Sequence, residues 1–319
     1  MKPVFKANIF ALIVIIGQVL GGTILVPIFR HMNLSMPTLL VLTQVIFLII
    51  PSIIYFIITK KSIKETLRLN PISFKEVLIL IVITLLSQFV AGFLVSISNM
   101  FSNNVVEEAF RTLESLSLGS MIFIMAVVPA ICEEIVMRGI VLSGYDKKST
   151  LKAALMNGLI FGILHLNPNQ FLYAFALGVL FAYIVRITNS IFATMLCHFT
   201  FNGFQVVLSR VMMNVPGVEE AKKSLGTLSR ADMFKELVNL GIVATIATII
   251  IIFLLKVLSN MRKKRGQIVS SSAYSYSGDG TMSIESDFNE KELREEFVIN
   301  IPFIITVLFY GFYIYRVYF

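Results

Sequence analysis

Three charged residues lie inside an apolar run of the chain. Glu133, Glu134 and Arg138 belong to the segment MIFIMAVVPAICEEIVMRGIVL. An ionised side chain near the centre of a bilayer costs about 2.5–3.5 kcal/mol on insertion scales, so such residues point to a function. Glu134 and Arg138 are four residues apart, acid first, and can pair on one helix face. Glu133 points about 100° away from that pair, which predicts a carboxylate free for chemistry. The plainer alternative is a helix end at the inner interface, where Arg138 snorkels and both acids meet water.

Two of the three histidines also lie in apolar segments. His165 falls in MNGLIFGILHLNPNQF and His198 in SIFATMLCHFTFNGF, whereas His31 sits in the short turn FRHMN. A single histidine on an apolar helix is more often a hydrogen-bonded core residue than a ligand. Two of them on separate helices beside buried acids favour a common site. Asn202 follows His198 by four residues, so both face the same way.

Such a set of side chains can generate a hydroxide-like nucleophile in two ways. Glu133, His165 and His198 could hold Zn²⁺ and leave one position for an activated water. Alternatively, Glu133 could take a proton from water directly, without metal, while histidine orients that water. In either case an amide such as that of Asn202, or a histidine, could donate a hydrogen bond to the oxyanion formed from a peptide carbonyl. The single-helix zinc signature HExxH is absent.

The composition places these residues in a membrane. The chain has 319 residues, of which 56% are hydrophobic and 14% charged, and its mean hydropathy is +0.84. These values exclude a soluble enzyme and a disordered chain, and the apolar runs of about twenty residues are long enough to span a bilayer as helices. The expected fold is an all-α polytopic transmembrane bundle of about eight to nine spans. The expected helices cover 7–29, 36–59, 76–98, 119–141, 151–166, 171–187, 190–213, 238–258 and 298–315.

The depth of the candidate residues raises a question that the sequence leaves open. Glu133 and His198 lie about 10–12 Å from the expected inner face, whereas His165 lies about 21 Å from it if its helix starts at 151. The three residues can meet only if the short helix 151–166 is tilted or sunken. Pro129, one turn before Glu133, removes a backbone hydrogen bond and could open a wet pocket there.

The charge and cysteine content limit which membrane orientation and which binding partners we expect. The chain carries 27 Lys and Arg against 19 Asp and Glu, and the positive-inside rule predicts a cytoplasmic N-terminus in what we expect to be a bacterial cell membrane. This excess gives no support for nucleic-acid binding. The run Arg262–Arg265 is expected to anchor the inner face and to touch anionic lipid. Cys132 and Cys197 are expected to be small core residues without a disulfide, and the aromatic residues near 171–183 and 303–319 to face lipid or pack.

Three short motifs together resemble a known family. Glu-Glu-x-x-x-Arg at 133–138, Phe-x-x-x-His at 161–165 and His-x-x-x-Asn at 198–202 are similar, in this order, to the motifs of the CAAX-protease and bacteriocin-processing family (CPBP, also called Abi) of intramembrane metalloproteases, which includes CAAX prenyl endopeptidases. The likeness covers roughly residues 119–205. It implies that Glu133 activates water, that Glu134 and Arg138 support it, that His165 and His198 position the water or ligate metal, and that Asn202 assists the oxyanion.

The leading hypothesis is an endopeptidase that cleaves a membrane-associated peptide or protein; prenylated C-terminal motifs and bacteriocin leader peptides are the substrate classes that the resemblance allows. One alternative is a non-catalytic immunity or scaffold protein that binds partners through the same pocket. Another is a proton-relay transporter, which the lack of an evident internal repeat counts against.

The expected organisation has five parts. They are N-terminal transmembrane helices (1–110), a catalytic core (119–214), an outer loop with a further span (215–260), a basic anchor with a flexible polar loop (261–297) and an appended C-terminal span (298–319).

Overall fold

The computed structural model describes residues 2–101, 113–217, 229–264 and 296–318. Within these ranges the regular structure consists of helices, with no strand. Eight of the helical runs are long and apolar enough to cross a membrane. The expected all-α polytopic bundle is therefore confirmed.

Each of the nine expected apolar runs coincides with a helical run. The first three runs are α1 (Pro3–His31), the continuous series α2 (Met36–Gln44), η1 (Val45–Ile49) and α3 (Ile50–Thr59), and α5 (Phe74–Ser98), with a short α4 (Ile63–Thr66) between the last two. The fourth is the series α7 (Leu118–Ile122), η2 (Phe123–Val127), α8 (Val128–Glu134) and η3 (Ile135–Val141), in which η denotes π-helix. The others are α9 (Thr150–Leu164), α10 (Pro168–Thr188), α11 (Ile191–Met213), α13 (Arg230–Lys264) and α15 (Ile301–Tyr318).

Several helices begin at a serine or asparagine that caps the first turn. The side chains of Ser35, Ser117 and Ser149 accept backbone N–H groups of α2, α7 and α9, and Asn167 does the same for α10. Such a side chain satisfies an N–H group that the helix leaves unpaired, which is why the apolar runs start at these residues.

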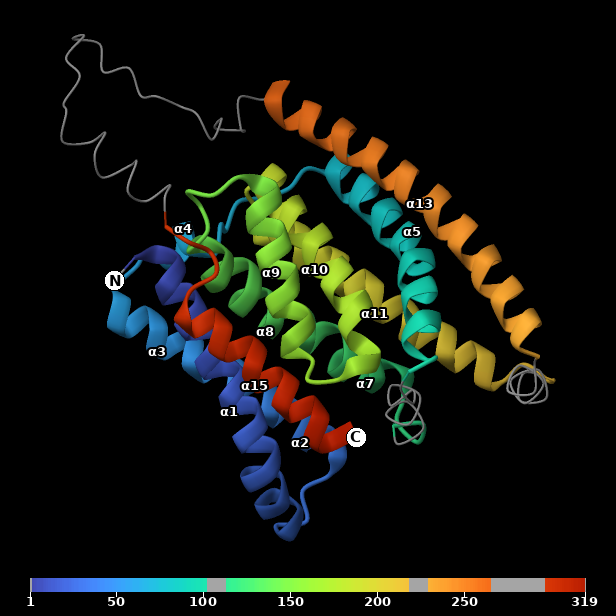
Figure 1. Ribbon diagram of the computed structural model, residues 1–319, viewed down its shortest axis with the longest axis horizontal. Coiled ribbons are helices and arrows are strands. Elements are labelled where there is room, and N and C mark those ends of the chain that lie inside the picture. The colour runs from blue at the N-terminus through green and yellow to red at the C-terminus, as the bar shows by residue number, and fades with distance from the viewer. Residues whose placement is uncertain (1, 102–112, 218–228, 265–295, 319) are drawn as a thin grey trace.

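The helices α9, α10 and α11 lie at the centre of the bundle, between α5 with α13 on one side and α1 with α15 on the other (Figure 1). The pair α9 and α10 packs very closely because glycines line the contact. A Cβ built on Gly158 would lie 2.8 Å from the Phe175 carbonyl oxygen, and one on Gly178 would lie 2.6 Å from the Gly158 Cα. Only glycine allows the two backbones this approach.

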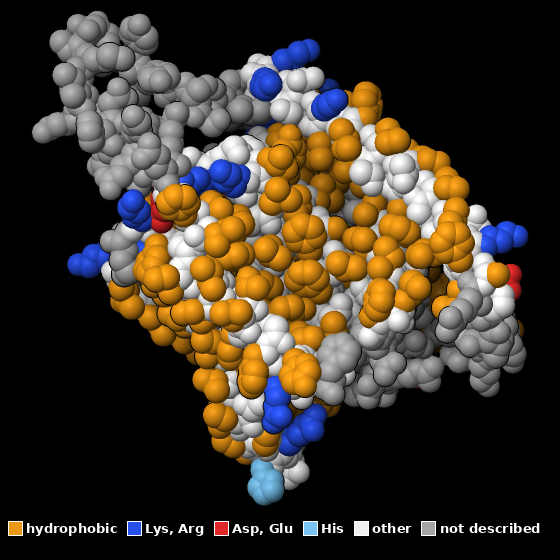
Figure 2. Space-filling view, viewed as in Figure 1, with side chains coloured by type: hydrophobic (Ala, Val, Ile, Leu, Met, Phe, Trp, Pro, Cys, Tyr) orange, Lys and Arg blue, Asp and Glu red, His pale blue; other side chains and the backbone are white. Residues whose placement is uncertain are grey.

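Hydrophobic side chains cover the middle of the face shown in Figure 2, and Lys and Arg side chains gather towards its ends. Many large apolar residues of the outer helices are exposed, among them Ile57, Ile58 and Phe253. A surface of this kind is suited to lipid tails.

The basic run at the end of α13 differs from the expectation. Arg262 is buried and forms an ion pair with the buried Glu76 of α5, so it fastens two helices together and does not face lipid. Lys263 and Lys264 are exposed. Of the polar stretch 266–296, only Glu296 belongs to the described residues; the predicted flexible loop and short surface helix lie outside them.

Candidate active site

The expected ion pair forms within the fourth helical run. Arg138 Nη1 lies 3.0 Å from Glu134 Oε1, and both side chains are fully buried. The guanidinium of Arg138 stands over the Phe161 ring at 4.2 Å and near the Phe181 ring at 5.3 Å. These contacts place the pair in the interior of the bundle and contradict a water-exposed helix end.

Glu134 has a second partner, which the sequence reasoning missed. Its Oε1 lies 2.9 Å from Nδ1 of His198, on the neighbouring helix α11. Because a carboxylate can only accept, Nδ1 of His198 carries the proton. In the neutral tautomer with the proton on Nδ1, Nε2 on the other side of the ring is the acceptor. Glu134 thus fixes both the orientation and the tautomer of His198.

Glu133 lies on that other side of the imidazole. Its Oε2 is 3.9 Å from His198 Nε2, and its side chain is 13% exposed. Among the described residues, Oε2 has no hydrogen-bond partner. A separation of 3.9 Å allows one water to lie at about 2.8 Å from both atoms. Glu133 thus lies outside the Glu134–Arg138 pair, as the helical spacing predicted.

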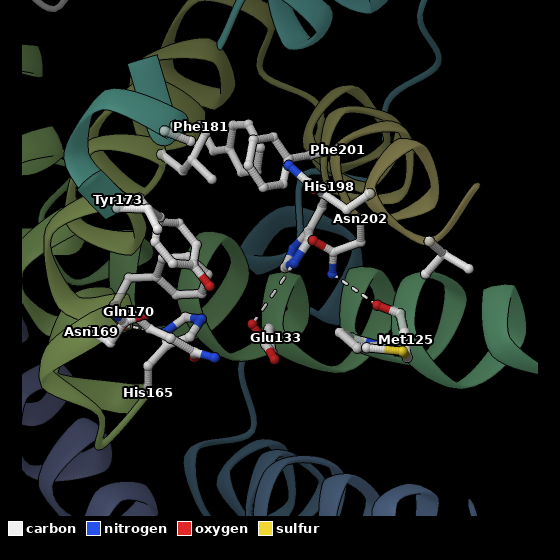
Figure 3. A pocket seen from close by; sticks show the side chains of 18 residues that line it. Met125, Glu133, His165, Asn169, Gln170, Tyr173, Phe181, His198, Phe201 and Asn202 are labelled. Carbon is white, nitrogen blue, oxygen red and sulfur yellow. Dashed lines mark hydrogen bonds and ion pairs between the residues drawn. The ribbon is translucent and has the colours of Figure 1, made fainter. Parts of the chain in front are cut away.

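His165 approaches the same place from the end of α9. Its Nδ1 is 2.8 Å from the Phe161 carbonyl oxygen, and its ring meets the Phe161 ring edge-on with centroids 4.7 Å apart. A carbonyl oxygen only accepts, so this contact leaves His165 Nε2 unprotonated as well. His165 and Glu133 line one cavity (Figure 3). The helical run continues past η3 to Ser143, so Glu133 lies roughly 15 Å from the end of this run. The difference in membrane depth between Glu133 and His165 is therefore smaller than the sequence led us to expect.

Asn202 is held by the main chain of the fourth helical run. Its Nδ2 donates to the Met125 carbonyl oxygen at 2.9 Å. Four residues after Met125 the chain has Pro129, which has no N–H group to donate to the Met125 carbonyl oxygen. The π-helical segments η2 and η3 flank α8 at this point, and such segments are frequent at functional sites. The proline therefore frees an acceptor that ties Asn202 in place, with one of its two amide N–H groups engaged.

These side chains surround a cavity of about 440 Å³. Figure 3 shows Glu133, His165, His198 and Asn202 around it, together with Tyr173. The remaining wall is mostly apolar and comes from α5, η2, α8, α9, α10 and α11. It consists of Ala91, Gly92, Val95, Met125, Pro129, Phe161, Asn169, Gln170, Leu177, Phe181, Phe201, Gln205 and Val206.

Sequence reasoning missed the contribution of the aromatic residues. It predicted packing or lipid contact near 171–183, whereas Tyr173 and Phe181 also line the cavity. Phe161 belonged to a recognised motif, but its position under the Arg138 guanidinium was not foreseen. The only sequence signal for Tyr173 is its place eight residues after His165, and a helix reversal intervenes between the two.

The proposed zinc ligands do not form a ready metal site. Among the described residues, no three His, Cys, Asp or Glu side chains converge as a group that could hold a metal ion. Both imidazoles have Nδ1 engaged and Nε2 available, which suits either a metal or a water. Zinc at Glu133, His165 and His198 stays a prediction. Cys132 and Cys197 are buried free thiols, as expected.

The described residues thus form a polytopic bundle of apolar helices with a carboxylate and two imidazoles around one cavity. Residues 115–204 match the family model described as "Type II CAAX prenyl endopeptidase Rce1-like". The match to this family model confirms the resemblance, and the matched residues include all six of the predicted site residues.

A curated relative matches the same kind of region. The chain is 33% identical over 89 residues to the protein named "Putative membrane peptidase YdiL" of Bacillus subtilis (strain 168). The alignment covers 28% of this chain and 36% of the relative, so the chain spans about a third of the relative's length. No solved structure matches.

Proposed function

We propose that this protein is an intramembrane endopeptidase that hydrolyses a peptide bond in a membrane-associated peptide or protein. The observation that carries the proposal is the gap of 3.9 Å between Glu133 Oε2 and His198 Nε2 at the cavity, with Glu134 fixing the imidazole from behind. The match of residues 115–204 to the Rce1-like model and the name of the Bacillus subtilis relative support the same chemistry.

The proposed reaction uses one water between Glu133 and His198. Glu133 removes a proton from this water as its oxygen adds to the peptide carbonyl carbon, and His198 Nε2 accepts the second hydrogen bond of the water. The free amide N–H of Asn202 donates to the resulting oxyanion. When the C–N bond breaks, the proton on Glu133 passes to the leaving amine. The products are a carboxyl group and an amine, and Glu133 is again a carboxylate.

The cavity wall suits an apolar segment of substrate. Leu177, Phe181, Phe201 and Val206 supply much of its surface, and Glu133 is the one acidic or basic side chain, imidazoles aside, among the described residues that line it. Prenylated C-terminal motifs and bacteriocin leader peptides are the two substrate classes to be compared.

The decisive test is Glu133→Gln in the full-length protein reconstituted in liposomes. Internally quenched peptides of both classes serve as probes. We expect the variant to lose at least 10²-fold in kcat, because an amide cannot take the proton. The matched control is Glu65→Gln, at an exposed position of α4, which should cleave as the wild type does. Wild-type activity in Glu133→Gln would contradict the proposal. If cells that carry Glu133→Gln keep the biological function of the wild-type protein, that result would favour the immunity or scaffold role.

Chelation separates the two forms of the mechanism. If water is activated without metal, dialysis against a chelator leaves peptide cleavage unchanged. If Glu133, His165 and His198 hold Zn²⁺, cleavage falls with the metal content of the purified protein and returns when Zn²⁺ is added.

A further inference from the structure

We propose that Tyr173 is a further catalytic residue, whose hydroxyl donates a hydrogen bond to the oxyanion formed during peptide hydrolysis. This inference rests on the proposed function, because it concerns the same cavity and the same reaction. It starts from a count of the hydrogen-bond donors that the cavity offers.

The groups nearest the proposed water are acceptors. Glu133 is a carboxylate, and His198 and His165 each use the N–H of Nδ1 elsewhere, on Glu134 and on the Phe161 carbonyl. Neutral imidazoles bound in this way present only an acceptor to the cavity. Three acceptors can bind and deprotonate a water, but none of them stabilises a negatively charged oxygen.

Two other amide side chains of the wall have one N–H group engaged, whereas the Gln170 amide has none engaged within the described residues. Asn169 Nδ2 donates to Asn99 Oδ1, and Gln205 Nε2 donates to Gln88 Oε1. Asn202 retains one N–H after its bond to Met125. Within the described part of the chain, no hydrogen bond joins the Tyr173 hydroxyl to another group, so its proton is available.

The Tyr173 ring is held in a fixed position. It stacks on Phe201 with centroids 6.5 Å apart and an interplanar angle of 20°, and it meets His165 edge-on at 6.4 Å. Figure 3 shows its hydroxyl directed into the cavity, on the side of His165 and Glu133.

The chain reversal between α9 and α10 builds this placement. Leu166 turns the chain with a φ of 51°, and Asn167 caps the new helix with its side chain. Gly158 and Gly178 then allow α9 and α10 to pack in close contact. A donor fixed before the reaction stabilises developing charge without reorganising, which is what an oxyanion requires.

Tyr173→Phe tests the proposal, because it removes the hydroxyl and keeps the ring. On an internally quenched peptide that the wild type cleaves and Glu133→Gln does not, we expect kcat to fall by about 10²–10³-fold with KM within about twofold. Binding of the corresponding phosphinate peptide, a mimic of the tetrahedral intermediate, should weaken by a similar factor.

Two control variants sharpen the result. Tyr183→Phe makes the same change on the same helix, at a residue that packs against the core and does not line the cavity, and should leave kcat unchanged. Gln170→Met removes a side-chain amide of the cavity wall that makes no hydrogen bond within the described residues, and should have only a small effect on kcat.

The outcomes are distinguishable. If Glu133→Gln abolishes cleavage but Tyr173→Phe matches the wild type, the role of Tyr173 is overturned and the proposed function stands. If Gln170→Met shows the large loss instead, Gln170 is the donor and the inference is wrong. If the wild type cleaves no more than Glu133→Gln, the proposed function fails and this inference fails with it.

Discussion

The central and the outer helices of this bundle include spans that are apolar enough in sequence to cross a membrane, but these spans differ in what surrounds them. Half of the apolar window of Leu118–Val141 and of Pro168–Thr188 is buried (50%), against 17% in Met36–Thr59, Ala231–Lys264 and Ile301–Tyr318. The central helices therefore have protein neighbours that can satisfy polar groups, and the outer helices present apolar side chains to lipid. Ionisable residues deep in a span are tolerated only in the first environment.

Two buried ion pairs show the same difference. Glu134 and Arg138 form a pair within the fourth helical run, beside the cavity, and both side chains are fully buried. Glu76 and Arg262 join α5 to α13 near the ends of these helices, and the backbone N–H of Ser73 also donates to Glu76. The central pair orients a histidine, whereas the outer pair fastens a lipid-facing helix. Loss of the central pair should therefore affect stability and activity together, and loss of the outer pair should affect stability alone.

The largest effect is expected from Arg138→Met. The variant leaves Glu134 as a buried charge without its cation, which should lower the free energy of unfolding by about 3–5 kcal/mol. It should also abolish peptide cleavage, since Arg138 no longer holds Glu134, the partner of His198, in place. Unfolding can be followed in detergent with a thiol-reactive dye, because Cys132 and Cys197 are both buried and free. The double variant Glu134→Gln/Arg138→Met should recover part of the stability. A double variant as unstable as Arg138→Met would contradict this account.

Arg262→Met should have a smaller effect on stability and none on catalysis. Glu76 keeps the Ser73 N–H after the substitution, so we expect a loss of about 1–3 kcal/mol. The rate constant for peptide cleavage, measured below the unfolding temperature, should equal that of the wild type. Equal losses in Arg138→Met and Arg262→Met would remove the distinction between the two regions.

Gly158→Ala tests the close contact at the centre. Its Cβ would lie 2.5 Å from Val179 Cγ2 and 2.8 Å from the Phe175 carbonyl oxygen. We expect a loss of about 1–3 kcal/mol in the free energy of unfolding, with reduced activity as His165 moves. Gly22→Ala in α1, where a Cβ would meet nothing within 4 Å, is the control and should not destabilise the protein. A harmless Gly158→Ala would mean that α9 and α10 can separate without cost.

The smallest effect is expected at the junction of α1 with the C-terminal segment. The Glu296 carboxylate accepts the N–H groups of Val4 and Phe5, in the first turn of α1. Glu296→Gln removes the negative charge from this helix N-terminus and should cost about 0.3–1 kcal/mol, measured with the same dye. Cleavage should not change. A loss of activity would show that the outer helices affect the candidate active site, which would contradict the expected difference between the central and the outer helices.

The sequence was sufficient for the helices and for the chemistry of the individual residues. Runs of about twenty apolar residues can only span a bilayer as helices, since every backbone group must be satisfied within the segment. The pair Glu134 and Arg138 was predictable because both residues belong to one helix and the helical period fixes their relation.

The contacts between helices were not predictable in this way. No local pattern indicates that His198 bonds to Glu134 or that Asn202 takes up the Met125 carbonyl freed by Pro129. Arg262 was expected at the lipid surface because it begins a basic run, and only the packing of α13 on α5 shows that it is buried against Glu76. The positive-inside orientation, the five-part organisation and the choice between zinc and a metal-free water stay predictions.

By itself, the sequence determined that this chain is a membrane-spanning helical bundle with a carboxylate, two imidazoles and an amide placed where charge is costly, because composition and helical period act locally. The tertiary structure alone decided which atoms face one another. Separate helices can rotate and slide independently until their side chains pack, so the gap between Glu133 and His198, and the position of Tyr173 at the same cavity, exist only in the folded bundle.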